Sequence, residues 1–127
     1  MKALINTVDP DILDHLKSLE INFMDFAYRW VSCYLTREFD IYQIIRLWDT
    51  YLSEEDGFSQ FHCYVCASLL LHFANNLKEM GFEDAMMFLQ KLPTEHWDED
   101  ELNMLLAKAF EMKQLYHYNK HLDNHSE

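Results

Sequence analysis

Glycine and proline are scarce in this chain, with two residues of each among 127. Hairpins and tight turns depend on these residues, whereas long helices run best without them. Their scarcity therefore indicates an all-α protein. It also argues against a phosphate-binding loop, because Gly57 and Gly81 are the only glycines and lie far apart in the sequence.

Positive charge is also scarce, since 10 Lys and Arg residues face 22 Asp and Glu residues, for a formal net charge of -12. A surface of that sign repels nucleic-acid phosphates and anionic lipid headgroups. The longest strongly apolar run, residues 64–71, is far shorter than the roughly 20 residues that a membrane span needs. We therefore expect neither nucleic-acid binding nor direct membrane insertion.

Cysteine is sparse and odd in number, with three residues placed inside apolar runs. Such usage is typical of a reducing compartment and argues against a disulfide framework. No basic stretch followed by an apolar one opens the sequence, as a secretory signal would. These features together predict a cytoplasmic protein.

Apolar residues, in contrast, make up 50% of the chain and aromatic residues 15%, which is ample for a packed core. Their helical spacing predicts one helical domain over residues 1–118 and a polar tail over residues 119–127. Residues 59–80 are apolar nearly all round as far as residue 77, which is typical of a central helix covered on every side. We thus predict about six helices packed around one long central helix at residues 59–80.

Two further helices can be placed from their patterns. One is expected to begin near Asn22 and to end around residues 37–39. Asp40 can cap the next, and Gln43 can return a side-chain bond in a variant of the capping box. The buried stripe predicted for that helix consists of Ile41, Ile44, Ile45, Trp48 and Tyr51.

Two groups of residues invite a metal hypothesis. Cys63 and Cys66 form a C-x-x-C pair, but it lies inside an apolar helix and no second pair supplies the four ligands that zinc needs. His117, His121 and His125 step by four but lack an accompanying carboxylate motif. We interpret the cysteines as core residues and the histidines as a solvent-facing tail, and therefore predict no metal and no cofactor.

Residues 26–54 carry the most distinctive pattern, FAYRWVSCYLTREFDIYQIIRLWDTYLSE. This stretch resembles the C-terminal half of the TBC domain of Rab GTPase-activating proteins. FHCYVCASLLL at residues 61–71 and FLQKLPTEHW at residues 88–97 extend the resemblance in the same order and at similar spacing. The resemblance covers roughly residues 9–116.

The resemblance implies a function in vesicle trafficking as an activator of a GTPase, not as an enzyme in its own right. The complete family domain accelerates GTP hydrolysis by GTP-bound Rab-family GTPases with an arginine and a glutamine inserted in trans. The motifs that carry these groups, I-x-x-D-x-x-R and Y-x-Q, do not occur in this sequence. The resemblance thus implies no catalytic residue here, but a scaffold that holds the N-terminal half of the domain and shapes part of the Rab-binding surface. Through its GTPase partner such a protein reaches Golgi or endosomal membranes.

The only three arginines all lie in the segment that carries the resemblance. For Arg29 and Arg46 we predict structural ion pairs with nearby carboxylates such as Glu38 and Asp49, their stems covering aromatic surface. The third, in the run Arg37, Glu38 and Phe39, falls between helices, where functional residues tend to gather. That run either contacts the GTPase or is a helix terminus with an inward-turned Phe39, and both readings stay open.

A different class of protein also fits the composition, namely an acidic helical interaction module unrelated to GTPases. Such a module would use apolar helix faces to bind partner helices. If half of a larger domain is absent, its aromatic and Met-rich contact surface is left bare, and a bare patch tends to be covered by association. On that basis we predict self-association of the chain or exchange of a helix between copies.

Overall fold

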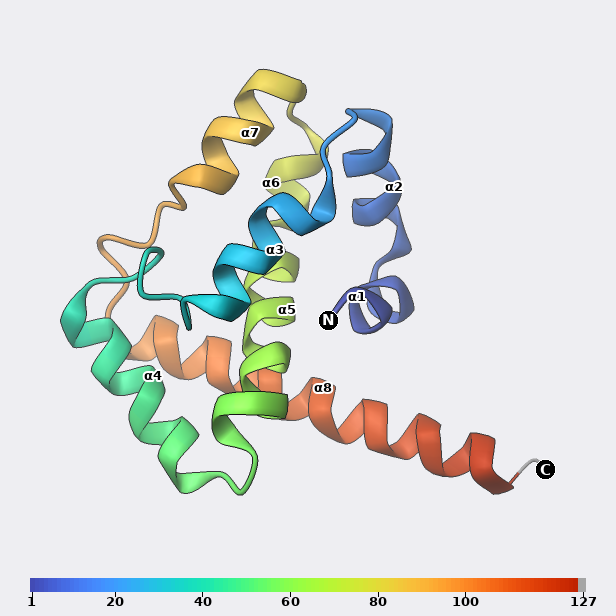
Figure 1. Cartoon of the computed structure of the whole chain (residues 1–127), viewed down its shortest axis with the longest axis vertical. Coiled ribbons are helices and arrows are strands. Elements are labelled where there is room, and N and C mark those ends of the chain that lie inside the picture. The colour runs from blue at the N-terminus through green and yellow to red at the C-terminus, as the bar shows by residue number, and fades with distance from the viewer. Residues whose placement is uncertain (126–127) are drawn as a thin grey trace.

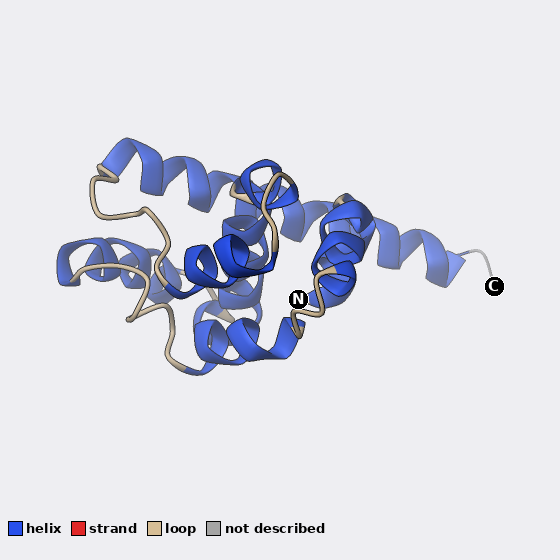
Figure 2. Cartoon of the chain, turned by 90° about the horizontal axis from the view of Figure 1, so that it is seen from above, coloured by secondary structure: helices blue, strands red, loops and turns tan. Residues whose placement is uncertain are grey.

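The structure is a computed structural model that describes the backbone of residues 1–125 and the side chains of residues 1–116. Within these residues the chain consists of helices and loops only, as Figure 2 shows, so the all-α prediction is confirmed. The elements are α1 (Lys2–Val8), α2 (Pro10–Ser18), α3 (Phe23–Ser32), α4 (Ile41–Ser53), the π-helical turn η1 (Gly57–Phe61), α5 (His62–His72), α6 (Ala74–Lys78), α7 (Phe82–Gln90) and α8 (Glu99–His125).

Helix α5 is the centre of the molecule. It packs against α1, α3, η1, α6 and α8, and Figure 1 shows it upright among them with α8 crossing it. Val65, Leu69 and Leu70 are completely buried, and α5 has no polar face. An apolar helix of this kind is stable in water only when neighbours cover it on all sides.

The prediction of one continuous helix over residues 59–80 is wrong, because this segment is divided into three elements. The π-helical turn η1 precedes α5, and a break at Phe73 separates α5 from α6. The Phe73 ring packs against Phe88 at 5.2 Å and against Trp97 at 5.7 Å between ring centroids. Burial of this aromatic ring offsets the helical hydrogen bonds lost at the break.

The count of about six helices is also corrected, because residues 1–125 contain eight α-helices. One of the two additional helices comes from the break at Phe73. The other is α1, which the sequence did not indicate because no side chain caps its first turn. Its Leu4 and Ile5 are nevertheless buried in the core.

Helix α3 begins as predicted, with the Asn22 side chain accepting a hydrogen bond from the Met24 N–H. It ends at Ser32, however, not around residues 37–39. Tyr34 and Leu35 adopt positive φ angles of 53° and 64°, which reverse the direction of the chain. A left-handed residue with a side chain costs about 1–2 kcal/mol, and the complete burial of Leu35 offsets that cost.

Helix α4 has the predicted start and a different buried face. Asp40 and Gln43 form the reciprocal capping box. Ile41 and Ile45, predicted to be buried, are 65% and 52% exposed. The residues that face the core are Gln43, Ile44, Leu47 and Tyr51. Apolar residues lie on both faces of α4, so their spacing alone could not determine which face turns inward.

After α4 the chain turns back tightly against the end of that helix, and this close approach explains why residue 57 is a glycine. A Cβ atom on Gly57 would lie 1.8 Å from the carbonyl oxygen of Tyr51, whereas a Cβ on Gly81 would meet nothing within 4 Å. Only glycine fits such a close backbone approach without a shift of the chain. Gly57 therefore allows η1 to pack against α4.

Helix α8 begins at a cap formed by Asp98, whose Oδ1 accepts a hydrogen bond from the Glu101 N–H at 3.0 Å. Its backbone is helical as far as His125, so the polar tail predicted for residues 119–127 begins inside this helix. The side chains of His117, His121 and His125 lie outside the described residues. The domain boundary at residue 118 stays a prediction. None of the helices in residues 1–125 combines the length and apolar content needed to cross a bilayer.

A buried histidine joins three elements at the end of α3. His62 Nε2 lies 3.1 Å from the carbonyl oxygens of Trp30 and Val31, and its Nδ1 lies 2.9 Å from the Tyr51 hydroxyl. Because a carbonyl can only accept, Nε2 carries the proton and Nδ1 accepts from the Tyr51 O–H. Burial lowers the pKa of His62 below its usual value, so the neutral form is the one that the fold requires.

The low pKa of His62 makes the stability of the fold depend on pH. As the pH falls through about 6.5, the unfolded chain binds a proton at this histidine that the folded chain does not. We expect the free energy of unfolding to decrease from pH 7.5 to 5.5, with a limiting slope of about 1.4 kcal/mol per pH unit below 6.5. Urea unfolding at several pH values measures this. We expect His62→Gln to flatten the pH dependence of the free energy of unfolding and His96→Gln, a change at an exposed histidine, to leave it as in the unchanged chain. Equal slopes in the unchanged chain and both variants would contradict the conclusion that His62 causes the pH dependence.

Candidate functional site

The junction between α3 and α4, residues 33–40, is the part of the chain for which the sequence left a functional reading open. It faces the segment between α7 and α8, and the two come together at the left of Figure 1. Of the three residues singled out there, Arg37 is exposed, while Glu38 and Phe39 are 8% and 6% exposed. The junction therefore presents one of the three to solvent and packs the other two inside.

Arg29 anchors this junction from α3. Its Nε lies 3.0 Å from Glu38 Oε1, and its Nη2 donates to the Leu89 carbonyl oxygen at 2.8 Å. The Glu38 side chain is only 3% exposed, so its charge depends on the guanidinium beside it. Arg29, for which the sequence predicted a carboxylate partner, thus connects α3, the junction and α7.

Gln43 holds the segment between α7 and α8 against the start of α4. Its Nε2 donates to the carbonyl oxygens of Thr94 and Trp97 at 2.7 and 3.1 Å, while its Oε1 accepts from the Asp40 N–H at 2.9 Å. In return the Thr94 hydroxyl donates to the Glu38 carbonyl oxygen. The amide is buried with both of its ends bonded, which fixes its orientation.

Sequence reasoning found only the capping role of Gln43 and did not single out Thr94. The only signal was its place in FLQKLPTEHW, a segment that carries the family resemblance. A polar side chain that becomes buried in such a place needs a hydrogen-bond partner. Its partner, the Glu38 carbonyl, could not be deduced from a sequence separation of 56 residues.

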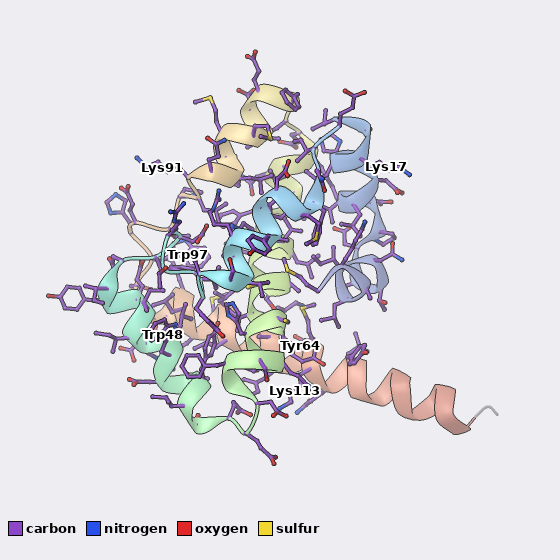
Figure 3. The ribbon with its side chains drawn as sticks, in the orientation of Figure 1. Lys17, Trp48, Tyr64, Lys91, Trp97 and Lys113 are labelled. Atoms are coloured by element: carbon purple, nitrogen blue, oxygen red, sulfur yellow. The ribbon has the colours of Figure 1, made fainter. Side chains whose placement is uncertain are left out.

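Aromatic packing completes the attachment. The Phe39 ring lies 5.8 Å from Trp97, which in turn stacks on Phe73 at 5.7 Å. Figure 3 shows Trp97 in the segment beyond Lys91, close to the α3–α4 junction. The inward-turned Phe39 is therefore part of one aromatic cluster with the core.

A pocket of about 200 Å³ remains between the two segments. Arg37 and Asp40 line it from the junction, and Lys91 and Glu95 line it from the opposite segment. Arg37 has no hydrogen-bond or ion-pair partner among the side chains of residues 1–116. The pocket thus carries exposed charges of both signs.

Arg46 and Asp49 lie elsewhere, on the face of α4 that meets α8. Arg46 Nη1 donates to Thr50 Oγ1 at 2.7 Å and its Nη2 donates to Asn103 Oδ1 at 2.6 Å. The carboxylate near this guanidinium is Glu99, at 3.8 Å, so the predicted pairing with Asp49 is corrected. Asp49 is exposed one turn away.

The cysteines of the C-x-x-C pair lie on α5. Cys66 is completely buried, with its Sγ 3.6 Å from His62 Nε2, and Cys63 is partly buried. Burial raises the pKa of the Cys66 thiol well above its usual value, which keeps it protonated and unreactive. Within the described side chains, no group of three or more His, Cys, Asp or Glu residues is placed to hold a metal ion.

In the part of the chain that the structure describes, the α3–α4 junction of an all-α fold carries an exposed arginine beside a pocket lined by charged residues. The sequence model of the Rab-GTPase-TBC domain matches residues 1–78. The chain belongs to the RabGAP-TBC family, which confirms the resemblance seen in its sequence.

Individual relatives agree with this assignment. TBC1 domain family member 22A of Homo sapiens is 41% identical over 126 residues, which cover 94% of this chain and 24% of that protein. GTPase-activating protein gyp1 of Schizosaccharomyces pombe is 41% identical over 117 residues, 91% of this chain and 23% of that protein. The chain thus spans about a quarter of the length of the curated relatives it matches.

The fold matches as well. The crystal structure of the Ypt/Rab-GAP domain of Gyp1p superimposes with a TM-score of 0.85 and 41% sequence identity, over 90% of this chain and 35% of that one. The helical arrangement described above is therefore part of the TBC fold.

The ion pair at the junction can be tested by removing Arg29, its partly exposed partner. Arg29→Ala leaves the Glu38 carboxylate buried without a counter-charge and removes the bond to the Leu89 carbonyl. We expect a loss of about 3–5 kcal/mol in the free energy of unfolding, measured by urea denaturation. Lys91→Ala is the matched control, because its pair with Glu95 is 84% and 68% exposed and the loss there should stay within about 0.5 kcal/mol. Equal losses in the two variants contradict a structural role for Arg29.

Proposed function

We propose that this chain is the C-terminal subdomain of a Rab GTPase-activating protein and acts on GTP-bound Rab-family GTPases as part of a longer protein. The observation that carries the proposal is the superposition on the Ypt/Rab-GAP domain of Gyp1p at 41% identity. The resemblance of residues 26–54 to the C-terminal half of the TBC domain supports the choice of the C-terminal subdomain. A generic acidic interaction module has no reason to share both the order of these motifs and this fold.

The chemistry of GTPase activation determines which groups the rest of the protein must supply to the GTPase. Acceleration requires a donor that stabilises charge on the transferred phosphoryl group and a group that orients the attacking water. Neither of the two motifs that supply these groups in the family occurs in this sequence. We therefore propose that the N-terminal half of the TBC domain brings both, and that residues 1–127 serve as its scaffold.

Within that scaffold, Arg37 is our candidate for contact with the GTPase. It is exposed beside the pocket and has no ion-pair partner among the side chains that the structure describes, and the buried Glu38 and Phe39 fix the backbone on its C-terminal side. Because Arg29 and Arg46 are each bonded within the fold, they are not free to reach a partner. Arg37 thus acts in binding, while Arg29 and Arg46 hold the helices that present it.

The remaining partners follow from the same proposal. The protein is cytoplasmic and reaches Golgi or endosomal membranes through its GTPase. Large apolar side chains are exposed on several helices, among them Tyr28 at 68% and Met87 at 70%. Without the N-terminal half to cover such surface, the isolated chain self-associates; this stays a prediction.

A phosphate-release assay against a panel of GTP-loaded Rabs tests the function. Residues 1–127 alone should give no stimulation, and a longer chain that also contains the two motifs should be active. In the longer chain, Arg37→Ala should lower kcat/KM about tenfold through weaker binding, as expected for the loss of about 1.4 kcal/mol. Lys108→Ala, an exposed residue on α8, is the control and should leave the rate unchanged. Stimulation by residues 1–127 alone that Arg37→Ala abolishes would mean that the junction itself is catalytic, contrary to the proposal.

A further inference from the structure

A second concave surface lies between α4 and the first turns of α8. It encloses about 340 Å³. The two helices contact each other there, and Figure 1 shows the start of α8 beside α4. Arg46 connects the two walls of this groove, because it is bonded to Thr50 on α4 and to Asn103 on α8. The groove is therefore a fixed feature of the fold.

One wall of the groove is apolar and exposed. Tyr42 is 81% exposed and Ile45 is 52% exposed, and both line the groove from α4. Ile41 and Leu52 continue this apolar face along the same helix, at 65% and 73% exposure. The capping box fixes the start of α4 and Gln43 is tied inward, so this face cannot rotate into the core.

The rim of the groove is acidic. Asp49 on α4 and Asp98 and Glu99 at the start of α8 all line it, against the single positive charge of Arg46. Asp100 and Glu101 follow directly and are exposed. Acidic residues at a helix start are also stabilised by the helix dipole, but Asp49 lies in the last turns of α4, where the dipole does not favour it. The charge around the groove therefore exceeds what helix stability requires.

We propose that the α4–α8 groove binds a partner segment that carries large apolar side chains flanked by Lys or Arg, as a basic amphipathic helix does. The exposed apolar residues at positions 41, 45 and 52 recur at the spacing of one helix face, which is the pattern that a helix laid alongside would contact. The acidic rim supplies the charge complementarity that selects a basic segment and excludes an acidic one. A second copy of the chain does not fit this groove, because it would bring its own acidic rim to the same place.

This surface shares only Gln43 with the pocket beside Arg37, and the proposal does not rest on GTPase activation. Its occupant is defined by chemistry alone, so a synthetic amphipathic peptide of Leu and Lys is a suitable probe. The matching peptide of Leu and Glu has the same apolar face and the opposite charge. Isothermal titration calorimetry measures affinity, and amide chemical-shift changes in the labelled chain locate the bound peptide.

We expect the Leu/Lys peptide to bind with shifts on α4 and the start of α8, and the Leu/Glu peptide to bind at least tenfold more weakly. Ile45→Asp should lower the affinity for the Leu/Lys peptide at least tenfold. Met87→Asp adds the same charge to the exposed face of α7 and should not lower this affinity. This pair separates insertion into the groove from general attraction to an acidic protein. Circular dichroism checks that both variants keep their helices.

The charge of the rim is tested in the same way. The double variant Asp49→Asn, Glu99→Gln should lower the affinity for the Leu/Lys peptide and reduce the salt dependence of that affinity. The control double variant Asp25→Asn, Glu79→Gln removes two exposed charges, one on α3 and one directly after α6, and should leave both quantities unchanged. Equal binding of the two peptides, equal effects of Ile45→Asp and Met87→Asp, or a dimer in sedimentation that Ile45→Asp dissociates would each overturn the proposal.

Discussion

The hydrogen bonds of one buried amide, that of Gln43, determine how the two halves of this helical chain fit together. The amide caps α4 with its oxygen and holds the Thr94 and Trp97 carbonyls with its nitrogen. Thr94 then bonds to the Glu38 carbonyl, and Glu38 pairs with Arg29. A chain of polar contacts thus runs from α3 to the segment before α8. Because a buried polar group left unpaired costs about 1–3 kcal/mol, each of these contacts depends on the others.

Both functional surfaces follow from this arrangement. The pocket beside Arg37 exists because the junction is held against the segment from Lys91 to Glu95. The groove between α4 and α8 exists because the same hydrogen bonds turn Gln43 inward, which leaves Tyr42 and Ile45 facing outward. One fixed helix register therefore produces an arginine-bearing pocket and an apolar groove with an acidic rim.

The sequence determined the fold class and the family well, and the details of packing less well. Sparse glycine and proline and the apolar run around α5 pointed to an all-α fold, and local signals such as the Asp40–Gln43 capping box could be read from four residues. The early end of α3 could not be foreseen, because the positive φ of Leu35 is stabilised by burial in a core assembled from distant segments. Likewise, α4 carries apolar residues on two faces, and only the bonds from Gln43 to Thr94 and Trp97 decide which one is buried. The partner of Arg46 was missed for the same reason, since Asn103 and Glu99 come from another helix.

A double-mutant cycle between Gln43 and Thr94 tests the central claim most directly. Gln43→Met removes the amide at similar volume, and Thr94→Val removes the hydroxyl. If the two side chains belong to one cooperative network, their effects on the free energy of unfolding are non-additive, with an interaction energy of about 1–2 kcal/mol. Additivity within about 0.3–0.5 kcal/mol would show that the junction and the segment before α8 are held independently, which contradicts the account given for both surfaces.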